Sequence, residues 1–269
     1  MTPPPRLHVV TATAPDKAVI LRRGPSGQVA SILWDRQTNV FRLGQWLLGR
    51  IHEYRTDLSP DGRHLVYFAC RGGRCWTAVS RAPWLRALAF WPQASSWHGG
   101  GAFTDEGALW LNGAEAPPNL PDGLRPASTD AYLHSTDGFY IGNLYAAKMQ
   151  RRGWAHVAGD RYEAELKKTA VGGWALRMRL AIGERDRSLI STRFALAAAN
   201  GAETIDLTDW EWADTHGDHV QWTARGGLWQ ARLGADGSLE DRVLLHDFSD
   251  MEFQAIEAPY QGVQERPQP

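Results

Sequence analysis

The sequence has little lysine, little cysteine and no long hydrophobic run. Only four of its 29 basic residues are lysine, and the net charge of −1 argues against a general surface for nucleic acid or anionic membranes. No stretch approaches the roughly 18 apolar residues needed to cross a bilayer. The N-terminus also lacks the basic segment and long apolar segment of a secretion signal. We therefore expect a cytoplasmic protein with neither a nucleic-acid nor a membrane partner.

Cysteine is limited to Cys70 and Cys75, which bracket Arg71–Arg74. A hairpin with a four-residue loop would place the two thiols at opposed strand ends, where a disulfide is geometrically possible. In a cytoplasm the pair would stay reduced, and a structural zinc site would need two further ligands. We favour free thiols, with a local disulfide and a metal site as the alternatives.

Recognisable catalytic signatures are missing as well. The sequence contains no Gly-x-Ser-x-Gly elbow for a hydrolase nucleophile, and neither cysteine lies in a known nucleophile context. Paired carboxylates for glycoside cleavage would have to come from different repeats. We therefore predict no catalytic residue, no metal ligand and no cofactor, and we lean against an enzyme.

A unit of turn, strand, glycine turn and strand is present twice. The first copy begins at Ser59 and continues through His64–Cys70 to Trp76. The second copy begins at Thr215 and ends at Trp229. A repeated hairpin unit of this kind predicts a β-propeller.

Weaker copies of the unit extend along the chain, each a glycine-bearing turn followed by a candidate strand. The turns are separated by 31 to 45 residues, close to the roughly 40 to 50 residues of a four-stranded blade. We predict an all-β protein, one propeller domain over residues 1–269, with six blades favoured and five to seven possible. Strands from both termini would close the ring, and residues 261–269 would form a frayed tail. The turns lie at Gly27, Gly62, Gly107, Gly138, Gly173 and Gly217, and the strands at Val29–Trp34, His64–Cys70, Ala108–Leu111, Phe139–Ala146, Trp174–Leu180 and His219–Arg225.

The segment Ser59-Pro60-Asp61-Gly62-Arg63, followed by a hydrophobic strand, resembles the S-P-D-G turn of TolB-like and WD40-like propeller repeats. Looser copies stand at residues 104–107 and 135–138. The resemblance implies propeller architecture and says almost nothing about activity. It also implies that Asp61, Asp105 and Asp137 hold their turns by hydrogen bonds to backbone amides. Asp209-Trp210 matches a WD dipeptide, but the Gly-His partner expected upstream is missing.

Two segments are candidates for a binding surface. The loop Ser95–Phe103 holds three consecutive glycines, which would let its backbone approach a ligand or a neighbouring chain closely. A wide turn into a blade is favoured for this loop, and a binding loop is the alternative. The segment Asp206–His219 mixes carboxylates with imidazoles and could bind a metal, although aspartate-stabilised turns around a tryptophan-rich strand are favoured. The candidate binding residues are Trp97, His98, Gly99, Gly100, Gly101, Trp210 and Trp212.

Thirteen tryptophans and many arginines supply residue types that often anchor interfaces. We predict a non-catalytic binding or scaffold protein whose propeller loops engage a protein or peptide partner. The alternatives are a glycosidase- or hydrolase-type enzyme with a site in the central funnel, and a small-ligand binder in the central channel. An enzyme would gather carboxylates or a His–carboxylate pair with perturbed pKa values in the funnel. A binding module would expose an unusually large aromatic patch.

Overall fold

The computed structural model describes residues 3–14, 16–24, 27–94, 98–132, 141–160, 162–185, 188–198 and 204–260. Over this part of the chain, the strands form five antiparallel sheets, and each sheet is built from strands that follow one another in the sequence. None of the described helices is long and apolar enough to span a membrane.

Four of the five sheets have four or five strands, and the fifth is a short pair. The first sheet contains β1 (Arg6–Thr11), β2 (Lys17–Arg23), β3 (Gln28–Asp35) and β4 (Val40–Leu48). The second contains β5 (Arg50–Ile51), β6 (Asp57–Leu58), β7 (His64–Arg71), β8 (Arg74–Arg81) and β9 (Ala89–Gln93), with the 3-10 helix η1 (Glu53–Arg55). The pair is β10 (Gly101–Phe103) and β11 (Leu109–Leu111). After α1 (Ile141–Arg151) come β12 (Ala155–Gly159), β13 (Glu163–Thr169), η4 (Val171–Gly173), β14 (Trp174–Arg185), β15 (Ser188–Ala198) and β16 (Thr204–Asp206). The last sheet contains β17 (Trp212–His216), β18 (His219–Ala224), β19 (Gly227–Leu233) and β20 (Leu239–Asp247).

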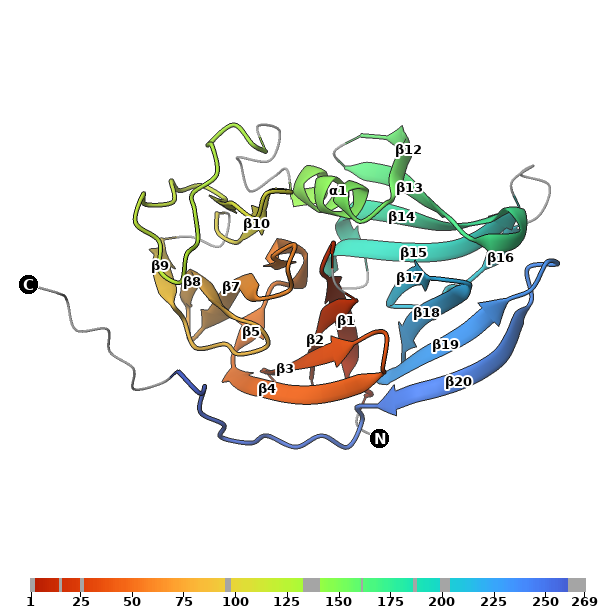
Figure 1. Cartoon of the computed structure of the whole chain (residues 1–269), viewed down its shortest axis with the longest axis horizontal. Helices are drawn as coiled ribbons and strands as arrows, with labels where there is room; N and C mark the ends of the chain where they lie inside the picture. The colour runs from red at the N-terminus through yellow and green to blue at the C-terminus, as the bar shows by residue number, and fades with distance from the viewer. Residues whose placement is uncertain are drawn as a thin grey trace, which may run out of the picture.

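The sheets stand around a common centre like blades (Figure 1), which is the arrangement of a β-propeller. Strands near the centre are buried on both faces because neighbouring sheets cover them, as in β2 and β7. Outer strands such as β20 are mostly exposed. The predicted all-β propeller is therefore confirmed as a fold.

The predicted number of six blades is wrong for the described residues, which form four full blades and the pair β10–β11. The unit expected after Gly138 accounts for part of the error. That turn lies outside the described residues, and much of the strand predicted at Phe139–Ala146 belongs to α1 instead. Alanine, leucine, lysine and methionine favour a helix there, and Gly153, with a φ of 83°, follows its end.

The first and last sheets meet through side chains. The backbone N–H of Leu7 in β1 donates to Glu211 Oε2 at 2.7 Å, and Arg22 donates to the backbone oxygens of Phe248 and Ser249 at 3.0 Å each. Trp34 and Trp212 pack in one shared core cluster there. We call this junction the seam. Since β1 and β20 lie in different sheets, closure by strands from both termini is not confirmed for the described residues.

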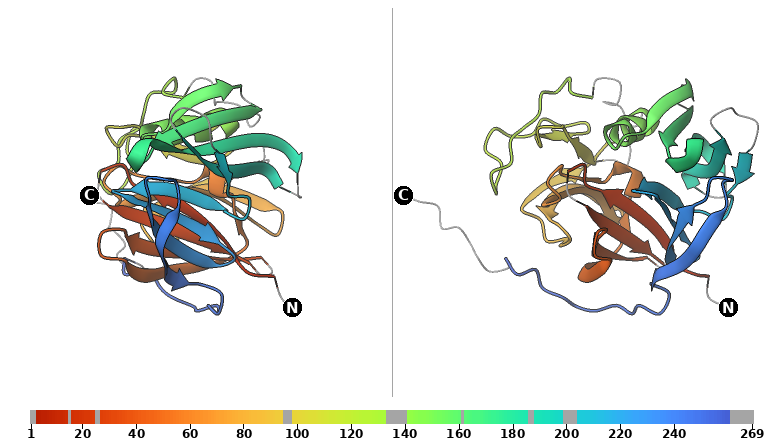
Figure 2. Two further views of the ribbon diagram at one scale, coloured as in Figure 1. Left: turned by 90° about the vertical axis from the view of Figure 1, so that its right-hand side faces the viewer. Right: turned by 45° about the vertical axis from the view of Figure 1, so that its right-hand side comes forward.

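Beyond β20, the chain runs in extended form beneath the first sheet (Figures 1 and 2). Gln45 Nε2 donates to the backbone oxygen of Ile256 at 2.7 Å, and the hydroxyl of Tyr260 donates to the backbone oxygen of Arg86 at 2.6 Å. We call residues 249–260 the strap. The tail predicted at 261–269 lies outside the described residues.

The hairpin β7–β8 carries a disulfide between Cys70 and Cys75. The two residues face each other across the strands, and the turn is the two-residue Gly72-Gly73, whose φ values of 55° and 77° fit a type I′ turn. The favoured free thiols are therefore wrong, because the strands continue further than expected and bring the sulfurs together. At the preceding turn, Asp61 Oδ1 accepts the backbone N–H of Arg63 at 3.0 Å, as the propeller resemblance implies.

Candidate functional site

The glycines of the loop predicted to bind a ligand are buried by the protein itself. A Cβ at Gly99 would lie 2.5 Å from the ring of Phe68, and one at Gly100 would lie 2.5 Å from the backbone oxygen of Arg55. A Cβ at Gly101 would clash with the backbone oxygen of Trp110. These glycines let chain segments of the protein pack closely and present no open surface to a ligand. His98 is exposed beside them, and Trp97 lies outside the described residues.

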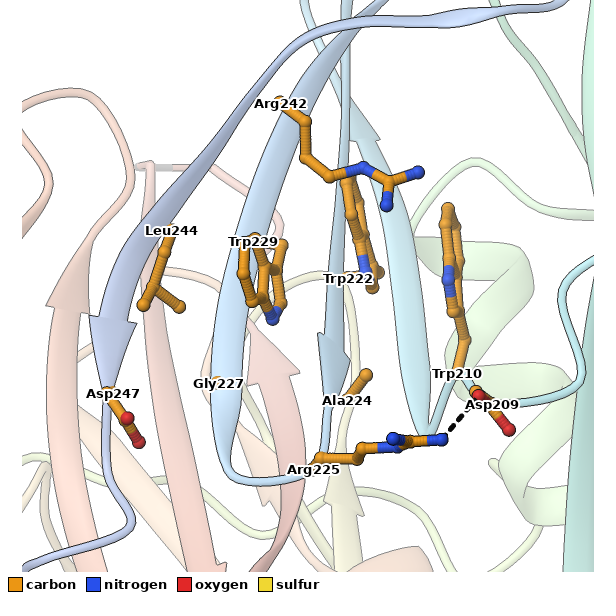
Figure 3. A pocket seen from close by; sticks show the side chains of 10 residues that line it. All are labelled: Asp209, Trp210, Trp222, Ala224, Arg225, Gly227, Trp229, Arg242, Leu244 and Asp247. Atoms are coloured by element: carbon orange, nitrogen blue, oxygen red, sulfur yellow. Dashed lines mark hydrogen bonds and ion pairs between the residues drawn. The ribbon is translucent and has the colours of Figure 1, made fainter.

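The two candidate tryptophans of the later segment have different surroundings. Trp212 is 3% exposed and meets Trp34 edge to face in the core at the seam. It is therefore a packing residue with no open surface. Trp210 precedes β17 and lines a hollow of about 290 Å³ beside the last sheet. We call this space the tryptophan hollow (Figure 3).

Three nearly parallel indoles form a row in the tryptophan hollow (Figure 3). The rings of Trp210 and Trp222 stack with centroids 4.5 Å apart at 5°, and those of Trp222 and Trp229 lie 6.4 Å apart at 12°. Trp222 on β18 faces Trp229 on β19, and Leu244 on β20 continues the row. Opposed positions on adjacent strands share one face of a sheet, which aligns the side chains. Gly227 leaves room for the ring of Trp229, because a Cβ there would lie 2.7 Å from its Nε1.

Charged groups rim the apolar row on two sides (Figure 3). The guanidinium of Arg242 lies 5.4 Å from the centroid of the Trp222 ring, a cation–π distance. At the other end, Arg225 pairs with Asp209 at 3.0 Å. Asp247 is bound by the N–H and hydroxyl of Ser249, which lower the pKa of its carboxyl. Among the described residues, Arg242 has no carboxylate partner, so it is available to a ligand.

The centre of the propeller holds a second cluster, made of buried ion pairs. Asp57 Oδ1 accepts from Arg152 at 2.6 Å, and Asp214 accepts from Arg36 at 3.1 Å and from Lys168 at 2.6 Å. Both carboxylates are almost fully buried. Each carboxylate is therefore already satisfied by a cation of the protein itself.

Burial lowers the pKa values of two basic groups at this centre, Lys148 and His8. The ammonium of Lys148 donates to the backbone oxygens of Tyr54 and Thr56, both at 2.8 Å, and burial lowers its pKa to about 7. Burial, with the nearby charge of Lys148, lowers the pKa of His8 to about 3. The cavity among these groups is only about 20 Å³, room for about one water molecule. Perturbed pKa values were expected of an enzyme's funnel, but this geometry favours a structural role.

The acidic segment before β18 distributes its side chains over separate contacts. Asp214 belongs to the central cluster, His216 lies 3.1 Å from Asp16, and His219 lies 2.6 Å from Asp218. Within the described ranges, no group of three or more histidine, cysteine, aspartate or glutamate side chains could hold a metal ion.

The sequence pattern predicts only one member of the tryptophan hollow, Trp210, and does not point to Trp222, Trp229 or Arg242. The sequence does indicate that Trp222 and Trp229 are neighbours, because the two-residue turn at Arg225-Gly226 places them opposite each other. The hairpin register of the second repeat copy therefore encodes this pair.

No protein-family model and no curated protein matches the sequence. Similar solved structures include the tricorn protease, with 10% identity and a TM-score of 0.41 over 93% of this chain and 27% of that one. The propeller domain of the trilobed protease from Pyrococcus furiosus has 9% identity and a TM-score of 0.30 over 93% and 98% of the two chains. The propeller domain of Myceliophteria thermophila Cps50 (Swd1) has 12% identity and a TM-score of 0.33 over 89% and 86%. The chain thus spans about a quarter of the tricorn protease, and these likenesses concern the fold alone.

Proposed function

We propose that this β-propeller is a non-catalytic binding protein that engages a protein or peptide partner through the tryptophan hollow. The observation that carries the proposal is the row of Trp210, Trp222 and Trp229 beneath the guanidinium of Arg242. Trp229 is the half-buried indole that a partner can contact, whereas Trp210 and Trp222, 9% and 3% exposed, support it by stacking. Tryptophan and arginine are the residue types most enriched among binding anchors.

The chemistry of the hollow restricts the partner. An aromatic or proline side chain would pack on the indoles, as extended proline-rich peptides do in aromatic-lined grooves. A neighbouring carboxylate would pair with Arg242, since the other rim arginine, Arg225, already contacts Asp209. We therefore propose a short extended segment with an aromatic or proline residue close to an acidic residue.

Selection from a random peptide library tests this proposal, because the library samples partner sequences of every kind. Peptides selected from a displayed library on the full chain would be synthesised and their affinities measured by tryptophan fluorescence. We expect R242E to weaken binding at least about 10-fold, the loss of one charge-assisted contact. Arg242 is exposed, so the substitution leaves the fold intact. W229L should also weaken binding, with thermal unfolding as the check on folding.

The matched control is R74E, which makes the same charge change at an exposed position on the β7–β8 hairpin. Peptides that bind R242E and R74E equally well would contradict the assignment of the tryptophan hollow. Failure to enrich any peptide containing an aromatic or proline residue would contradict the proposed function itself.

A further inference from the structure

A second hollow of about 390 Å³ lies between the first and second sheets. Lys17 lines it at one end of β2, whereas Arg22, near the other end of β2, contacts Phe248 and Ser249 beside the tryptophan hollow. The two hollows therefore lie at opposite ends of the propeller strands. We call the second one the basic hollow, and its size is within the range of small-molecule sites.

Positive charge dominates the basic hollow. Among the described residues, the basic hollow has one lining carboxylate, Asp122. Arg81 holds it through two hydrogen bonds of 2.8 and 2.5 Å, and it lies 2.8 Å from His64 Nε2. These partners hold the pKa of the Asp122 carboxyl far below its usual range. Lys17 and Arg42 also line the basic hollow, and neither has a carboxylate within ion-pair distance among the described residues.

Arg63 is a third cation of the basic hollow without such a partner in the described part of the chain. Asp61 and Asp35 feel the charges of Arg63 and Lys17 but form no ion pair with them, and both carboxylates bind groups of their own turns. Asp61 accepts the N–H of Arg63 and the hydroxyl of Ser59, and Asp35 accepts the N–H groups of Gln37 and Thr38. A chain with a net charge of −1 thus places three cations without ion-pair partners around a single concave space.

Flat and apolar groups line the basic hollow together with these cations. Tyr260, from the strap, is fixed by its hydrogen bond to the backbone oxygen of Arg86, and the guanidinium of Arg81 lies 5.2 Å from its ring. Trp84 and Leu33 are half-buried beside it. Aromatic and apolar surfaces of this kind accept a planar ring by stacking.

We propose that the basic hollow binds a small phosphate-bearing ligand of the nucleoside diphosphate or triphosphate class. One carboxylate would be satisfied by a single arginine, whereas three cations that line one hollow match an anion with several charges. Arginine also pairs with phosphate oxygens bidentately. Lys17, Arg42 and Arg63 hold the phosphates, and Trp84 and Tyr260 receive the base. This inference does not rest on the proposed function of the tryptophan hollow.

Calorimetric titration of the full chain with ADP, at low salt and without added divalent metal, tests the proposal. We expect one molecule of ADP per chain, and at least about a 10-fold weaker affinity in the double variant R42A/R63A, since Arg42 and Arg63 are exposed and their removal leaves the core intact. The control is R71A/R74A, which removes the same charge from the exposed end of the β7–β8 hairpin. Its affinity should stay within about twofold of the natural chain.

Two further ligands separate the contributions of charge and ring. We expect pyrophosphate to bind more weakly than ADP, and the variant Y260L to reduce the affinity for ADP more than that for pyrophosphate. No binding at 1 mM ADP, an equal loss in R71A/R74A, or binding of hexa-aspartate as tight as that of ADP would overturn the proposal. Pyrophosphate binding as tight as ADP would overturn the assignment of a nucleoside.

Discussion

Replacement of Asp57 by alanine is expected to lower the free energy of unfolding by about 3–5 kcal/mol, because it leaves buried cations without a partner. Asp57 is fully buried in β6, where it accepts from Arg152 at 2.6 Å and from the backbone N–H of Phe103 at 2.9 Å, with Arg151 at 3.9 Å. One carboxylate therefore joins the second sheet, the pair β10–β11 and the end of α1. Chemical denaturation of purified protein measures the loss.

The control for this variant is D105A. Asp105 is exposed and its carboxylate contacts the neighbouring Arg151 at 2.6 Å, so its removal should cost less than about 1 kcal/mol. Equal losses of unfolding free energy in D57A and D105A would show that the contribution of Asp57 to stability does not depend on its burial. D57N should fall between the two, because the amide keeps the shape but loses the charge.

Acid is expected to destabilise the protein well above the pH at which carboxylates titrate. Burial lowers the pKa of both His8 and His52 to about 3, so the unfolded chain binds protons from about pH 6.5 downward while the folded chain does not. Stability is therefore lost as the pH falls from about 6.5 towards 3. Each imidazole ring should lower the free energy of unfolding by about 2 kcal/mol between pH 6.5 and 4.5.

Denaturation midpoints of H8Q and H52Q, measured across this pH range, test the effect. Each variant should be less sensitive to acid than the natural chain, even if its stability at neutral pH is lower. H156Q provides the comparison, because His156 is exposed. Its replacement should leave the slope of the denaturation midpoint against pH unchanged. Identical pH slopes in all four proteins would rule out the buried imidazoles as the cause.

The propeller fold could be predicted because its signal is local. Turn glycines followed by apolar strands recur along the chain, and five of the six turns do precede real strands, as at Gly62 and Gly217. The remaining unit failed because residues 141–151 have a local preference for helix. Counting blades required knowing which strands share a sheet, and β14 to β16 join β12 and β13 in one blade through pairing that no single turn encodes.

The candidate site was harder to predict because it depends on contacts between distant residues. The glycine run at Gly99 and Gly100 predicts a close approach to a ligand or to another chain segment, but the neighbours themselves, Phe68 and Arg55, are brought near only by the folded chain. Trp210 was identified because it lies in an unusual segment, whereas Arg242 stands more than 30 residues away in an unremarkable strand. Concave sites assembled between strands need tertiary structure before their members can be recognised.

The seam has a mechanical consequence. In the described residues, the first and last sheets meet through contacts such as Leu7–Glu211 and Arg22–Phe248, with no strand shared between them. The ring of blades is therefore closed by side-chain contacts at the seam and not by a strand that belongs to both terminal blades. Because no shared strand fixes the perimeter of the ring, the curvature of the propeller follows from how neighbouring blades pack against one another.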